Sequence, residues 1–265
     1  MSYRFTILGC GSSGGVPRVG NDWGACDPSN PRNRRRRCAL LIERIGKLGT
    51  TTVLVDTGPD LREQLLSVRL SRLDAVLFTH DHADHTHGID DLRNIAYLSK
   101  RRVPVYADAE TRMSLEERFG YCFTGKAGPN YPPILEARDI RAPAPLTIEG
   151  PGGEIVVTPV PQEHGDIVSL AFRVAGLAYS PDISGLPETS EPLLAGLDVW
   201  IVDALRYIPH PSHLSVKQAL GWIERLKPRR AILTHLHVDL DYAKLQRELP
   251  AGIEPAFDGM TIELG

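Results

Sequence analysis

The sequence HDHADH at residues 80–85 places four potential metal ligands within six positions, directly after an apolar segment. That segment, DAVLFT at residues 74–79, predicts a short strand buried on both faces. The end of a buried strand fixes the first histidine firmly, and the turn that follows lets the other donors converge. These donors are His80, His82, Asp84 and His85. Because a catalytic zinc ion takes three protein ligands and leaves one position open, four donors at this spacing predict two metal ions.

Three further donors stand at the ends of other expected strands. They are His164 after the expected strand at 154–160, Asp182 after the one at 177–180, and His235 after the one at 230–234. Each one alone is equally typical of a turn residue or a helix cap. Together they occupy the same kind of place, the end of a core strand, where functional residues gather. All nine histidines fall in tight groups between His80 and His237, which indicates ligands rather than scattered core histidines.

Short apolar and β-branched segments joined by glycine turns predict a strand-rich fold with helices between the strands. Strands are expected over residues 3–9, 38–45, 51–56, 74–79, 103–107, 154–160, 167–174, 177–180, 198–203 and 230–234. Helices are expected over residues 61–68, from about 85 to 98, and over 109–119, 191–195, 214–226 and 241–249. This order predicts an α/β protein with two sheets packed face to face and covered by helices. A doubly wound nucleotide-binding sheet fits poorly, because the glycine-rich turn after the first strand lacks the P-loop lysine.

The composition shifts between residues 120 and 145, where eight of 26 residues are glycine or proline. The segment has little periodicity, so it predicts a loop, lid or protruding arm. No sequence repeat of 20–50 residues is evident, and we expect residues 1–265 to form a single domain.

The charge is unevenly distributed along the chain. The 30 basic and 33 acidic residues give a net charge of −3, and five of the arginines lie within residues 32–37. Without these five arginines the chain has 25 basic and 33 acidic residues, a net charge of −8, which argues against a protein that coats nucleic acid. The arginine strip is compatible with a site for one phosphate group, or with a solvated loop.

Targeting signals are not evident. No apolar stretch approaches the ~20 residues of a membrane span, and the opening residues lack a basic region followed by a long apolar run. The four cysteines show no C-x-x-C spacing. We therefore expect a protein of the reduced cytoplasm, without a membrane partner.

The HDHADH run followed by His164, Asp182 and His235 resembles the metallo-β-lactamase superfamily of binuclear metal hydrolases. This resemblance implies a four-layer αβ/βα sandwich. The segments LGCGSSGGVP at 8–17, GIDDLR at 88–93 and SPDISGLP at 180–187, with the arginine strip, resemble its phosphodiesterase branch. That branch includes enzymes that open phosphoribosyl cyclic phosphates and, more distantly, the tRNase Z endonucleases.

The resemblance implies a ligand set for two divalent ions, zinc or manganese. His80, His82 and His164 would hold one ion, Asp84, His85 and His235 the other, and Asp182 would bridge both. His213, in the segment PSHLS, matches the histidine that these relatives place over the substrate phosphate, and together with Asp84 it is the expected catalytic residue. The bridged ions would lower the pKa of a shared water toward ~7 for in-line attack on phosphorus. His213 would then protonate the leaving oxygen.

Supporting roles are expected for several other residues. Arg93, Arg35 and Arg37 are candidates for holding the rest of an anionic substrate, although Arg93 could equally pair with Asp90. Asp203, at the end of an expected strand, could orient a ligand histidine.

The sequence departs from some relatives in one loop. Those relatives carry a Cys-x-Cys-x-x-Cys cluster for a structural zinc, whereas this chain keeps only Cys26. We therefore expect no third metal, and we expect packing by Trp23 to hold the loop.

Three functions compete. The first is hydrolysis of a small cyclic or simple phosphate diester of the ribose or nucleotide type. The second is a tRNase Z-type RNA endonuclease, which the net charge argues against and for which residues 120–145 could serve as a short arm. The third is a thioester or lactam hydrolase, in which the arginine strip has no evident role. A homodimer is compatible with the pattern, because relatives are frequently dimers.

Overall fold

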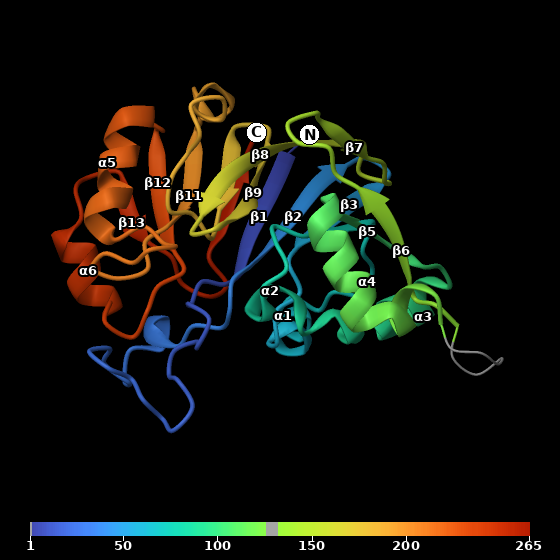
Figure 1. Cartoon of the computed structure of the whole chain (residues 1–265), viewed down its shortest axis with the longest axis horizontal. Coiled ribbons are helices and arrows are strands. Elements are labelled where there is room, and N and C mark those ends of the chain that lie inside the picture. The colour runs from blue at the N-terminus through green and yellow to red at the C-terminus, as the bar shows by residue number, and fades with distance from the viewer. Residues whose placement is uncertain (1, 126–131) are drawn as a thin grey trace. The chain divides into compact units, whose positions relative to one another are not determined.

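The structure is a computed structural model that describes residues 2–125 and 132–265 (Figure 1). The chain divides into two compact units. The first comprises Met1–Thr6, Ala39–Val156 and Thr261–Gly265, and the second comprises Ile7–Cys38 and Val157–Met260. Two strands, β1 (Ser2–Gly9) and β8 (Ile155–His164), pass from one unit into the other.

The first seven-stranded sheet is mixed and has the order β14-β1-β2-β3-β4-β5-β6. Its other strands are β2 (Ala39–Gly46), β3 (Gly49–Val55), β4 (Ala75–Leu77), β5 (Val103–Ala107), β6 (Leu135–Asp139) and β14 (Thr261–Leu264). β2 and β3 form the expected antiparallel hairpin, and β3 to β6 run parallel. All three residues of β4 are fully buried, as the apolar run in front of the histidines predicts.

The helices of the first unit follow its parallel strands. They are α1 (Leu61–Ser67), α2 (Ala83–Thr86), α3 (Leu92–Ser99) and α4 (Ala109–Phe123). The helix expected from about residue 85 to 98 is divided into α2, a 3-10 turn at Ile89–Asp91, and α3. Gly88 stands at this break, and a Cβ there would lie 2.1 Å from the carbonyl oxygen of Gly58. The close approach of the two backbone segments therefore requires glycine at this position.

The segment at 120–145 is not a loop throughout. Its first residues complete α4, and Leu135–Asp139 form β6, which pairs in parallel with β5. The sequence LEARD hides this edge strand because it has only one strongly apolar residue and two exposed ones at its end. Residues 126–131, on which part of the predicted arm falls, lie outside the described residues.

The second sheet has the order β13-β12-β11-β10-β9-β8-β7. Its remaining strands are β7 (Leu146–Ile148), β9 (Ile167–Val174), β10 (Leu177–Ser180), β11 (Val199–Asp203), β12 (Arg230–Thr234) and β13 (Ile253–Pro255). β10 to β13 run parallel, while β8, β9 and β10 are antiparallel. The carboxyl ends of the parallel strands therefore lie at one edge of the sheet, which is where Asp182 and His235 follow.

Two helices, α5 (Val216–Leu226) and α6 (Tyr242–Glu248), pack beside β12 and β13 (Figure 1). Trp200 of β11 is fully buried in the core beneath them, and its Nε1 donates to Ser180 Oγ at 3.0 Å. α5 begins two residues later than expected because Ser215 caps it through a reciprocal hydrogen-bond pair with Gln218. Two mixed sheets with these helices confirm the predicted α/β class.

Among the helices of residues 2–125 and 132–265, none combines the length and the apolar character that crossing a bilayer requires.

Candidate metal centre

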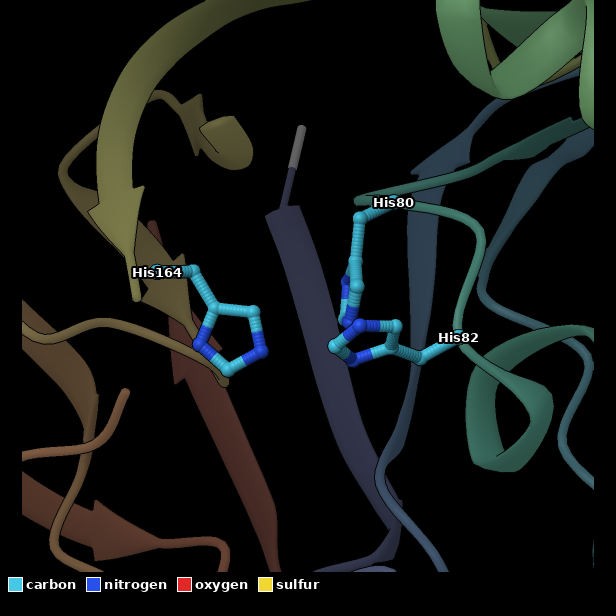
Figure 2. A group of neighbouring side chains, drawn as sticks. All are labelled: His80, His82 and His164. Atoms are coloured by element: carbon cyan, nitrogen blue, oxygen red, sulfur yellow. The ribbon is translucent and has the colours of Figure 1, made fainter. Parts of the chain in front are cut away.

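Four of the seven expected ligands belong to the first unit, on the segment that follows β4. Figure 2 shows the rings of His80 and His82 side by side on this segment, together with His164 at the end of β8. The ring centroid of His80 lies 4.5 Å from that of His82 and 4.4 Å from that of His85. His80 and His85 are buried, whereas His82 is exposed. The turn after the buried strand thus gathers three imidazoles, as expected.

A residue that the sequence analysis missed, Asp56, orients two of these histidines. Its Oδ2 lies 2.7 Å from His85 Nδ1 and accepts a hydrogen bond from Thr79 Oγ1 at 2.9 Å. The same hydroxyl lies 2.9 Å from His80 Nδ1. Burial raises the pKa of Asp56, while the adjacent His85 lowers it. The signal was present in the sequence, because Asp56 ends an apolar strand in the same way as the expected ligands do.

We expect Asp56→Asn to weaken metal binding by about 10–100-fold, the usual cost of losing a carboxylate that orients a ligand histidine. Oδ1 of Asp56 accepts from the Thr79 backbone N–H, while Oδ2 lies against Thr79 Oγ1 and His85 Nδ1. An amide has only one oxygen, so its NH2 group would replace one of these acceptors. The dissociation constant for zinc, measured by competition with a chromogenic chelator, checks this expectation. Asp139→Asn, an exposed carboxylate of the same unit, is the matched control. Equal zinc affinity in both variants would refute the role of Asp56.

In the second unit, two of the three expected ligands lie beside the third, the carboxylate of Asp182. Asp182 Oδ2 lies 3.6 Å from His164 Nε2 and 3.6 Å from His235 Nε2, and all three side chains are at most 2% exposed. His213 Nε2 lies slightly farther from the same oxygen, at 3.9 Å. Side chains from three separate strand ends therefore meet, as the sequence pattern predicts.

Hydrogen bonds made by Nδ1 fix the ring orientations of His164 and His213 in the second unit. His164 Nδ1 lies 2.6 Å from the carbonyl oxygen of Ser212, and because a carbonyl only accepts, Nδ1 carries the hydrogen. His213 Nδ1 lies 2.7 Å from Oδ2 of Asp203, which is fully buried. Burial raises the pKa of Asp203, and the nearby His235 opposes this effect. Asp203 thus orients His213, whereas the sequence analysis had considered it for a histidine that binds metal.

The donors within each unit fit divalent ions. Metal bonds of about 2.0–2.2 Å at tetrahedral angles place neighbouring ligand atoms about 3.3–3.6 Å apart. Asp84 Oδ2 and His85 Nε2 are 3.5 Å apart in the first unit, and the two shortest separations at Asp182 in the second unit are 3.6 Å. Imidazole and carboxylate are ligands that zinc and manganese both accept.

Arg35 has a different role from the predicted one. Its side chain is 2% exposed, and its guanidinium donates to the carbonyl oxygens of Leu240 at 2.7 Å and His237 at 3.3 Å and to Asn33 Oδ1 at 3.2 Å. These bonds tie the arginine strip to the loop after β12. Arg35 is therefore a structural residue that is not available to a substrate.

We expect Arg35→Met to destabilise the protein by about 2–4 kcal/mol, because the carbonyl oxygens of Leu240 and His237 and the Oδ1 of Asn33 each lose a charged donor in the interior. Urea unfolding followed by circular dichroism measures this free energy. Arg34→Met, an exposed neighbour in the same strip, should change it by less than about 0.5 kcal/mol. An equally small effect at Arg35 would contradict the structural role.

The other two arginines that were predicted to bind substrate have different surroundings from Arg35. Arg93 is paired with Asp90, which is the alternative considered for it. Arg37 is half-buried and lies against Gly15 of the glycine-rich turn.

The loop that carries Cys26 is held by packing. Trp23 packs against Val16, Cys26 and Val238, which confirms the expected contribution of Trp23. The thiol of Cys26 lies 3.3 Å from the carbonyl oxygen of Val238.

Comparison with known families identifies the class of protein. Residues 51–236, which include all seven expected ligands, match the β-lactamase superfamily domain. The chain therefore belongs to the β-lactamase superfamily, among its metal-dependent hydrolases and within their phosphodiesterase branch. Its fold is the α/β metallo-β-lactamase fold expected from the sequence.

Solved structures show the same relationship in more detail. The chain is 35% identical to a protein described as a new diphosphatase from the PhnP family, with a TM-score of 0.89 over 100% of this chain and 98% of the other. Human tRNase Z, short form, is 18% identical with a TM-score of 0.62 over 98% of each chain. At that identity the likeness shows the fold alone.

One relative is a longer protein. The chain is 32% identical over 260 residues to an octanoyltransferase of Porphyromonas gingivalis, covering 97% of this chain and 51% of the relative. The chain thus spans about half the length of this relative.

Proposed function

We propose that the seven expected ligands hold two divalent ions, zinc or manganese. His80, His82 and His164 would bind one ion, Asp84, His85 and His235 the other, and Asp182 both. The spacing of donor atoms within each unit supports this assignment. When bound, the ions would lower the pKa of a water molecule and neutralise charge on the phosphoryl oxygens.

We propose that the reaction is hydrolysis of a small phosphate diester of the ribose or nucleotide type. The observation that carries this proposal is the pair formed by His213 and the buried Asp203, at 2.7 Å. A histidine whose Nδ1 is hydrogen-bonded to a carboxylate keeps a fixed ring orientation, and the carboxylate stabilises its protonated form. His213 Nε2 is then a positioned proton donor for a leaving oxygen. Its 3.9 Å distance from Asp182 Oδ2 is longer than the 3.6 Å that separates His164 and His235 from the same oxygen.

Hydrolysis of bis(p-nitrophenyl) phosphate by the purified protein with Mn²⁺ or Zn²⁺ tests this function. We expect metal-dependent release of p-nitrophenolate, abolished by His82→Ala or Asp84→Ala. Turnover of nitrocefin or of a glutathione thioester without diester cleavage would overturn the proposal. Cleavage of precursor tRNA faster than of cyclic nucleotides would favour the endonuclease.

A second candidate is thioester hydrolysis, which uses the same metals on a carbonyl group. The observation that favours it is the similarity to half of a protein named for acyl transfer, an octanoyltransferase. The 35% identity over the whole chain to a diphosphatase supports the phosphodiesterase more strongly.

We also propose that the protein acts in the reduced cytoplasm. All four cysteines, Cys10, Cys26, Cys38 and Cys122, are buried thiols, which supports a reducing compartment. The homodimer stays a prediction.

A further inference from the structure

Asp81 stands between two expected ligands, His80 and His82, on the turn that follows β4 (Figure 2). Its side chain is 38% exposed and belongs to none of the expected ligands. The carboxylate lies against α4, where Oδ2 accepts a hydrogen bond from Ser114 Oγ at 2.5 Å and pairs with Arg118 Nη2 at 3.2 Å. These two donors are four residues apart on α4 and therefore share one face of the helix. The middle of the ligand turn is thus fastened to α4.

The main-chain carbonyl of Asp81 is held from two directions. Arg118 Nη2 donates to this oxygen at 2.6 Å, and Thr86 Oγ1 of α2 lies 3.4 Å from it. The Thr86 hydroxyl also donates to the carbonyl oxygen of His82 at 2.9 Å. Because the peptide group that joins Asp81 to His82 is planar, a fixed carbonyl oxygen fixes the plane from which the His82 residue begins. Arg118 therefore influences where the imidazole of His82 lies.

His82 needs this support more than the other two histidines of the turn. The rings of His80 and His85 are buried, and their Nδ1 atoms lie 2.9 Å from Thr79 Oγ1 and 2.7 Å from Asp56 Oδ2. His82 is exposed, so close packing does not restrict its ring in the same way. The position of an exposed ligand depends strongly on the backbone that carries it.

We infer that Arg118 and Ser114 are positioning residues that hold the ligand turn in the shape that binds metal. The inference rests on the proposed function, because it takes His80 and His82 as ligands of one ion. Both residues act through Asp81 and have no contact with the ion or the substrate in this role. They also keep the Asp81 carboxylate on α4, where it does not compete with the neighbouring imidazoles as a metal ligand.

The zinc affinity of Arg118→Met, measured by competition with a chromogenic chelator, tests this role without relying on turnover. We expect one of the two ions to bind about tenfold more weakly, the lower end of the loss found for residues that orient ligands. The visible absorption bands of the Co²⁺-loaded protein should change shape, because they report the geometry of the ligands. Arg118→Lys keeps a positive charge beside Asp81 and should recover part of the affinity.

Arg112→Met provides the matched control, because Arg112 belongs to the same helix and pairs with the exposed Asp139 at 3.2 Å. It should keep the affinity and the Co²⁺ spectrum of the wild type. Since an exposed ion pair contributes little to stability, the metal-free forms of both variants should unfold within about 2 °C of each other.

Equal zinc affinity in Arg118→Met and Arg112→Met would overturn the positioning role. So would a loss of affinity that comes with a clearly lower unfolding temperature of metal-free Arg118→Met, because general destabilisation would then explain it. Failure of the proposed function is seen separately, in the wild-type protein, as absence of zinc binding or of bis(p-nitrophenyl) phosphate hydrolysis.

Discussion

Replacing Asp182 with alanine should lower the rate of bis(p-nitrophenyl) phosphate hydrolysis by about 10³-fold or more, because the chain would lose the chemistry of both ions at once. Asp182 is the one side chain proposed to bind both ions. In the second unit its Oδ2 lies at ligand spacing from His164 Nε2 and from His235 Nε2. Removing it leaves these two imidazoles with no carboxylate between them. Metal content should fall together with the rate.

The control for this variant is Asp198→Ala, which removes an exposed carboxylate of the same unit and should leave both the rate and the metal content unchanged. Circular dichroism of Asp182→Ala establishes that the sheets are intact. A folded Asp182→Ala protein that retains two ions and most of its activity would contradict the bridging assignment.

Replacing His213 with alanine should lower kcat by about 10²–10⁴-fold while the metal content stays that of the wild type. His213 Nε2 lies 3.9 Å from Asp182 Oδ2, farther than His164 and His235, and its Nδ1 is held by Asp203. A proton donor matters most when the leaving oxygen is a strong base. The loss should therefore be larger for a 2′,3′-cyclic nucleotide, whose leaving group is an alkoxide, than for bis(p-nitrophenyl) phosphate.

This dependence on the leaving group separates an acid from a structural residue. Asp203→Asn should show the same pattern with a smaller loss, because it weakens the hydrogen bond that orients His213 but leaves the imidazole in place. An equal loss for both substrates, or a loss of metal in His213→Ala, would show that His213 has a different role.

The clustering of candidate ligands within each unit could be predicted from the sequence, because these candidates follow strands whose apolar pattern is strong. β4 and β12 are buried throughout or nearly so, and their hydrophobic runs mark where His80 and His235 begin the loops. Within one sheet, the carboxyl ends of parallel strands lie at the same edge, so residues that follow neighbouring strands lie close together. The fold class followed from the same pattern.

The supporting residues could not be predicted with the same success. A charged residue such as Arg35 is expected at the surface, and only the tertiary structure shows that three hydrogen-bond acceptors satisfy it in the interior. Edge strand β6 was missed because its exposed residues weaken the apolar signal.

The metal content of the purified protein, measured by inductively coupled plasma mass spectrometry after dialysis against metal-free buffer, tests the central claim most directly. Seven ligands from two units predict two divalent transition-metal ions per chain. A content near zero that added zinc or manganese cannot raise, or a content of one or three ions, would contradict the account.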